Sequence, residues 1–68
     1  MTPAELIKIR KATKLSQRAL SELLFYSLTT IKLWEKGKHP IPSGMREYLI
    51  RAEIDVDGIL KSTTNPEK

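Results

Sequence analysis

The stretch from residue 15 to residue 37, LSQRALSELLFYSLTTIKLWEKG, decides the fold because its apolar residues repeat at helical spacing in two separate runs. The first run predicts a short helix over residues 17 to 24, with Ser16 as its N-cap. The second run predicts a helix over residues 28 to 36, with Ser27 as its N-cap. The residues expected to form the two buried stripes are Leu20, Leu23, Leu24, Ile31 and Trp34.

The connection between these two helices is short, because only Phe25, Tyr26 and Ser27 separate them. Such a connection is typical of two helices that cross at a steep angle, as in a helix-turn-helix. Gly37 follows the second helix, and glycine is the residue that most easily adopts a left-handed helix end. The sequence therefore predicts a helix-turn-helix.

The second helix of this pair has an exposed arc of unusual composition. An advance of about 100° per residue turns Thr30, Ile31, Trp34 and Glu35 toward the core. The opposite, exposed side holds two leucines, Leu28 and Leu33, and two lysines, Lys32 and Lys36. Exposed leucines need a reason, and contact with thymine methyl groups in a DNA groove supplies one. The lysines can bind phosphate or guanine. The exposed arc consists of Leu28, Thr29, Lys32, Leu33 and Lys36.

Helices are also predicted on both sides of this pair. Residues 2 to 5, Thr-Pro-Ala-Glu, have the pattern of a capping box with proline at the first helical position, so a first helix runs from there to about Thr13. After a stiff loop at residues 39 to 42, Ser43 is expected to cap a fourth helix and Asp55 a fifth. The inward-facing residues of these helices are Leu6, Ile9, Met45, Leu49, Ala52, Val56, Ile59 and Leu60.

The predicted fold class is therefore all-α, a compact domain of five short helices over residues 1 to 61, with residues 62 to 68 as a disordered tail. A chain of 68 residues with no cysteine can build one modest core without disulfides, so a partner would add stability. No metal or cofactor is expected, because His39 is the only histidine and no carboxylate cluster accompanies it.

Two further classes of protein are disfavoured by the sequence. No apolar run approaches the roughly 18 residues of a membrane helix, and the first residues do not form a secretion signal, so we expect a cytoplasmic protein without membrane contact. The sequence lacks three motifs that are typical of enzymes: a glycine-rich phosphate loop, a Ser/His/Asp set and a pair of catalytic carboxylates. We therefore do not expect an enzyme.

Charge is distributed unevenly along the chain. Residues 1 to 46 hold nine lysines and arginines against three glutamates, a net charge of +6. Residues 47 to 68 hold three basic and five acidic residues, a net charge of −2. A basic front portion fits contact with nucleic acid, and a nearly neutral end fits contact with protein, although a solvated charged surface explains the same numbers.

A pattern without gaps carries a resemblance to a known family: Leu15-Ser16-Gln17, Leu20, Ser27, Thr30-Ile31 and Trp34-Glu35-Lys36-Gly37. It resembles the XRE-type helix-turn-helix family of lambdoid phage repressors and Cro, over about residues 5 to 60. The resemblance implies a lambda-repressor-like domain that binds double-stranded DNA. Two residues depart from the family pattern: Ser21 stands where alanine is usual, and Phe25 stands where glycine is usual. A phenylalanine at that turn implies either backbone strain or a small shift in the direction of the next helix.

The resemblance also implies roles for single residues. Leu28, Thr29, Lys32 and Leu33 would face base edges, and Arg10 would form a structural ion pair with Glu35. The expected DNA-backbone contacts are Gln17, Arg18, Ser27, Lys36, Lys38 and His39. The residues expected to form a homodimer interface are Ile54, Val56, Ile59 and Leu60, because they give more apolar surface than a small core needs.

These features favour a dimeric transcriptional repressor that occupies an inverted-repeat operator, in an autoregulatory role such as that of Cro-like repressors or of regulators beside anti-CRISPR genes. The alternative is an antitoxin that binds a toxin protein and also regulates its own operon. The few residues after Leu60 argue against this alternative, since antitoxins usually need a further segment to wrap the toxin. A purely protein-binding helical domain would have no use for the exposed Thr29 and Lys32.

Overall fold

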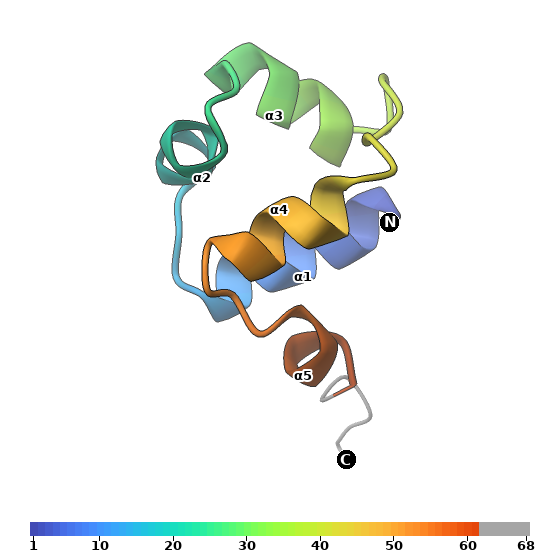
Figure 1. Cartoon of the computed structure of the whole chain (residues 1–68). Helices are drawn as coiled ribbons and strands as arrows, with labels where there is room; N and C mark the ends of the chain where they lie inside the picture. The colour runs from blue at the N-terminus through green and yellow to red at the C-terminus, as the bar shows by residue number, and fades with distance from the viewer. Residues whose placement is uncertain (62–68) are drawn as a thin grey trace.

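The computed structural model describes residues 1 to 61 and contains five α-helices in that part of the chain (Figure 1). They are α1 (Pro3–Ala12), α2 (Gln17–Leu24), α3 (Leu28–Glu35), α4 (Met45–Arg51) and α5 (Val56–Lys61). The all-α prediction is confirmed, and the predicted tail at residues 62 to 68 lies outside the described residues. None of these helices is long and apolar enough to cross a membrane.

The first three helices begin at the caps that the sequence predicts. The Thr2 hydroxyl accepts a hydrogen bond from the backbone N–H of Glu5, and the Glu5 carboxylate accepts one from the backbone N–H of Thr2, at 3.1 and 2.8 Å. Ser16 and Ser27 each accept from the backbone N–H three residues further on. Each cap satisfies a donor that the first turn of a helix cannot pair, which explains why the helices start at these residues.

The start of α4 differs from the prediction that Ser43 caps it. The helix begins at Met45 after Gly44, and no side chain caps it. The backbone N–H of Met45 donates instead to the carbonyl of Pro42 at 3.1 Å, so a tight backbone turn replaces the expected hydroxyl cap. For α5 the prediction is confirmed, because the Asp55 carboxylate accepts from the backbone N–H of Gly58 at 3.1 Å.

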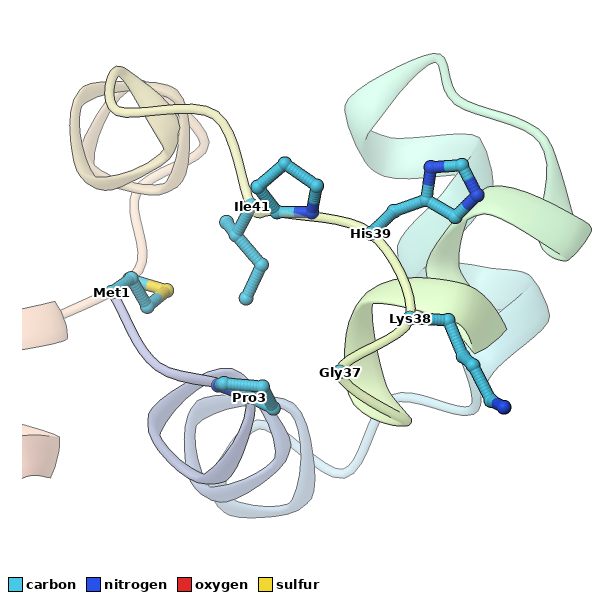
Figure 2. A pocket seen from close by; sticks show the side chains of 7 residues that line it. Met1, Pro3, Gly37, Lys38, His39 and Ile41 are labelled. Atoms are coloured by element: carbon cyan, nitrogen blue, oxygen red, sulfur yellow. The ribbon is translucent and has the colours of Figure 1, made fainter.

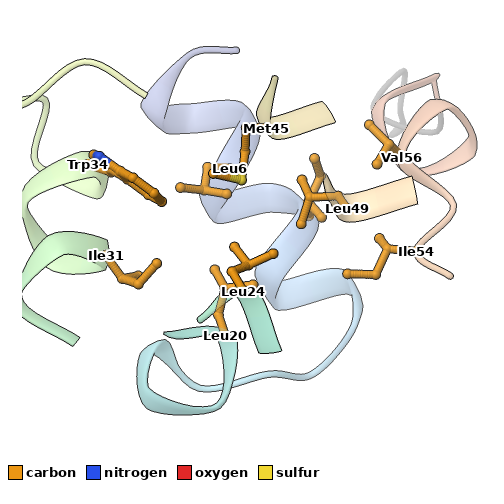
Figure 3. Close-up of a cluster of buried hydrophobic side chains, with 10 residues drawn as sticks. Leu6, Leu20, Leu24, Ile31, Trp34, Met45, Leu49, Ile54 and Val56 are labelled. Atoms are coloured by element: carbon orange, nitrogen blue, oxygen red, sulfur yellow. The ribbon is translucent and has the colours of Figure 1, made fainter. Parts of the chain in front are cut away.

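One core runs through all five helices (Figure 3). Leu23 was predicted to belong to it but is 39% exposed, while Ser21 is buried. The difference follows from the helical period, which puts Leu20, Ser21 and Leu24 on one side of α2. Leu23 lies about 100° around the helix axis from the centre of that side. The buried Ser21 hydroxyl donates to the carbonyl of Arg18 at 2.6 Å, so it is not left unpaired. The core residues are Leu6, Ile9, Leu20, Leu24, Ile31, Trp34, Met45, Leu49, Ile54 and Val56.

The end of the chain that was predicted to form a dimer interface is largely used by the monomer itself. Ile54 and Val56 are buried in the core of the single chain, and the half-buried Ile59 and Leu60 pack against that core. Burial of Ile54 and Val56 is a correction to the sequence interpretation, because a buried side chain is not available to a second copy. Their apolar character is explained by α5 packing against α1 and α4.

The helix-turn-helix pair and α5 lie at opposite ends of the molecule in Figure 1. The α3 helix packs against α1 and α2, and α5 packs against α1 and α4. On the other side of α3, Thr29, Lys32 and Lys36 are exposed, and this side carries the candidate site.

Candidate nucleic-acid interface

A buried ion pair holds the end of α3 against α1. Arg10 Nε lies 2.6 Å from Glu35 Oε2, and Arg10 Nη2 donates to Glu35 Oε1 at 3.1 Å. The two side chains are only 14% and 6% exposed, and Arg10 Nη1 also donates to the carbonyl of Leu15 at 3.1 Å. The implied pairing of Arg10 with Glu35 is therefore present. A two-pronged pair of this kind fixes orientation as well as distance, so it sets the angle of α3.

Gln17 has an internal contact that the sequence interpretation missed. Its amide Nε2 donates to Glu35 Oε1 at 3.0 Å, which joins the first residue of α2 to the last residue of α3. Glu35 thus accepts from both Arg10 and Gln17, and the three side chains connect α1, α2 and α3. The Oε1 atom of Glu35 accepts from Arg10 Nη2 as well as from Gln17, so the paired arginine alone gave no sign in the sequence that a further donor was needed. Contact of Gln17 with a phosphate stays a prediction.

The outward side of α3, here called the α3 arc, consists of Leu28, Thr29, Lys32, Leu33 and Lys36. Thr29, Lys32 and Lys36 are exposed, and the two leucines are half-buried. On the inward side Ile31 and Trp34 are fully within the core, where the Trp34 ring meets the ring of Tyr26 edge-on at 4.7 Å. The predicted inner side is confirmed for Ile31 and Trp34, and the predicted exposure is confirmed for Thr29, Lys32 and Lys36, the last being the C-cap just after the helix. Leu28 and Leu33 were expected to be exposed and are only half-buried, as Thr30 is.

The turn into α3 is built around Phe25. This residue has φ 61° and ψ 36°, a left-handed conformation that is unusual for a bulky residue and costs about 1–2 kcal/mol. The N–H groups of Phe25 and Tyr26 donate to the carbonyls of Glu22 and Ser21, the bonding pattern of a glycine-ended helix. The backbone strain predicted at Phe25 is therefore present, and the turn still makes the two hydrogen bonds of a glycine-ended helix. Ser27 then caps α3, and its hydroxyl also bonds to that of Thr30 at 2.8 Å.

Exposed basic side chains come before and after α3 along the chain. Arg18, near the start of α2, is exposed and forms only a loose pair with Glu22 at 3.7 Å. Gly37 has φ 75° and turns the chain from α3 into the following loop, where Lys38 and His39 are exposed. In Figure 2 these two side chains extend away from a shallow cavity of about 430 Å³ between the loop and the start of α1, whereas Ile41 points into it.

Residues 1 to 61 contain no group of three or more His, Cys, Asp or Glu side chains that could hold a metal ion. Comparisons of the chain with protein-family models, with curated proteins and with solved structures give no significant match.

Proposed function

We propose that the protein binds double-stranded DNA by inserting the α3 arc into the major groove, and that it represses transcription from the site it occupies. The observation that carries this proposal is the firm attachment of α3 through Glu35, combined with an outer side that the core does not use. A helix with its side chains is about 10–12 Å across and the major groove is about 12 Å wide, so a helix attached by one side can enter it.

Charge supports a nucleic acid as the ligand. Residues 1 to 46 have a net charge of +6, and within them α3 and the loop after it, residues 28 to 42, hold three lysines and one glutamate. Lys36 in the α3 arc, Lys38 just after it and Arg18 in α2 are all exposed, and their side chains are suited to phosphate contact. Such contacts release counterions, so binding should weaken steeply as salt is raised.

The composition of the α3 arc suggests which bases it would read. Among the described residues the arc has no amide or guanidinium side chain, so the paired hydrogen bonds that Asn, Gln or Arg make to adenine or guanine are not available there. Leu28 and Leu33 offer methyl groups to the 5-methyl group of thymine, Thr29 offers a hydroxyl and a methyl, and Lys32 offers a cation to guanine. We therefore expect thymine methyl groups to contribute to recognition.

A single α3 helix would contact only a few base pairs, so we propose that two copies bind an inverted repeat. A dimer placed over a promoter would exclude RNA polymerase sterically, and we propose that the promoter is that of its own gene. Such a repressor would work in the cytoplasm, where promoter DNA is found in a bacterial cell.

The test is selection of bound duplexes from a random DNA pool, followed by affinity measurements on the selected site. We expect an inverted repeat, a steep loss of affinity with salt, and weaker binding when single thymines that face α3 are replaced by uracil, which removes only the methyl group. Uracil at outer, uncontacted positions is the control. Recovery of no preferred sequence, together with affinity that does not depend on salt, would contradict the proposal.

A further inference from the structure

An apolar groove lies between the end of α2 and the outer side of α4. Leu23, Leu24, Phe25, Tyr48 and Ala52 line it, and it encloses about 460 Å³. Glu22 and Arg51 are the charged members of the lining. None of the α3 arc residues contributes to it.

Phe25 is the most exposed large apolar side chain in the described part of the protein, at 92%. Leu23 and Tyr48 are 39% and 48% exposed and line the same groove. The ring of Tyr48 meets that of Tyr26 edge-on at 6.4 Å, which fixes one wall of the groove against the α2–α3 turn. A projecting aromatic ring thus stands directly beside a hollow with apolar walls.

We propose that this groove is the contact between two copies of the chain, with Phe25 of each copy seated in the groove of the other. As the dimer contact of the proposed repressor it rests on the proposed function, but as a surface for self-association it can be tested without DNA. A two-fold pair requires one surface that is complementary to itself, and a surface with a projecting ring beside a hollow meets that requirement.

Charge identifies a second copy as the occupant. Arg51 forms no ion pair with another residue in the range 1 to 61, and Glu22 has only the loose, exposed contact with Arg18. A two-fold axis through the groove would bring Glu22 of one copy toward Arg51 of the other, and the same contact would occur twice. The charges in the groove lining are therefore complementary to those of an identical groove.

The size of the surface predicts a reversible dimer. Each buried aromatic side chain contributes about 150–250 Å², so two phenylalanines with an equal area of the facing groove walls bury about 600–1,000 Å², below the roughly 1,200 Å² at which stable interfaces begin. Because the α3 arc takes no part in the groove, two paired copies would each keep that arc free for DNA.

The test is sedimentation velocity of the full chain from micromolar to near-millimolar concentration. The parent should show a reversible monomer–dimer equilibrium, and Phe25→Gly should weaken it by about tenfold or more. Glycine suits the left-handed turn, so this variant should keep its helical circular dichroism. The matched control is Ile50→Ser, which removes an exposed apolar side chain of α4 that lies outside the groove. This variant should leave the equilibrium unchanged.

A charge exchange tests the two-fold arrangement itself. Arg51→Glu should weaken the dimer, and addition of Glu22→Arg in the same chain should restore it, because each charge would again face its opposite. A parent that stays monomeric, or a dimer that Phe25→Gly leaves intact, would overturn this inference even if the protein selects an operator. A dimer broken by Phe25→Gly would support it even if DNA binding failed, and that failure would count against the proposed function alone.

Discussion

The α3 arc and the groove beside Phe25 lie on either side of one short turn, yet they are built in opposite ways. The arc is held by a buried ion pair, and its exposed members are a threonine and two lysines. The groove is walled by leucine, tyrosine and alanine, and its lining includes one acid and one base. The same turn thus separates a surface suited to a polyanion from one suited to another apolar surface.

Salt should distinguish the two surfaces. Attraction between lysines and phosphates is lost as counterions compete, whereas removal of apolar area from water depends little on moderate salt. If both proposals hold, raising salt should release DNA while the protein remains paired. A substitution in one surface can therefore be checked against the other surface as an internal control.

The largest effect is expected when the attachment of α3 is broken. Glu35→Ala leaves the guanidinium of Arg10 buried without its carboxylate and removes the partner of Gln17, so the free energy of unfolding should fall by about 3–5 kcal/mol. Urea denaturation measures it. Glu22→Ala, measured at dilute concentration where pairing does not interfere, is the matched control, because its pair with Arg18 is exposed and should contribute less than about 1 kcal/mol. Equal losses for the two variants would contradict the role assigned to Glu35.

The caps and the two sides of α3 could be predicted from sequence because they depend on residues three or four positions apart. Ser16, Ser27 and the burial of Ile31 and Trp34 are local in this sense. The all-α class followed from the same local signals. The contact of Arg10 with Glu35 joins distant residues, and it was reached through the resemblance to a family rather than through any periodicity.

What the sequence could not show depends on how helices lie against one another. Helical spacing alone put Leu23 in the core, but the side of α2 that faces inward is set by its packing with α3, and Ser21 is buried instead. The apolar residues Ile54 and Val56 could equally have served a dimer or a monomer core, and only their burial decides. The groove lies between α2 and α4, two helices that are far apart in sequence, so no local sequence pattern predicts it.

A smaller effect, confined to the α3 arc, is expected for base recognition. Leu33→Ala should lower affinity for the selected operator by about 1–3 kcal/mol while leaving random DNA nearly unaffected, because the lost contact is to a base edge. Thr29→Ala should act in the same direction. Fluorescence anisotropy on both duplexes measures the difference, with Ile50→Ala as the control. If Leu33→Ala left operator preference unchanged in folded protein, the α3 arc would not be the reading surface.

On the groove side, Phe25→Gly should stabilise the monomer by about 1 kcal/mol, since glycine adopts the left-handed conformation without steric cost and the exposed ring contributes no core packing. For a domain of this size that corresponds to a rise in Tm of roughly 4–8 °C, measured at dilute concentration where pairing does not interfere. Phe25→Ala is the control, because it removes the ring but keeps the strain. If alanine stabilised as much as glycine, the strain at Phe25 would not be the cause.

The smallest effect is expected at the edge of the α3 arc. Lys38→Ala should reduce the slope of log affinity against log salt by up to about 0.9, the share of one phosphate, and should weaken operator and random DNA equally. Equal weakening distinguishes a contact to the backbone from the base contact of Leu33. The matched control is Lys61→Ala, which removes an exposed lysine from the last residue of α5, at the other end of the molecule (Figure 1). If the slope fell for Lys61→Ala and stayed the same for Lys38→Ala, DNA would approach the α5 end, and the α3 arc would lose its proposed role.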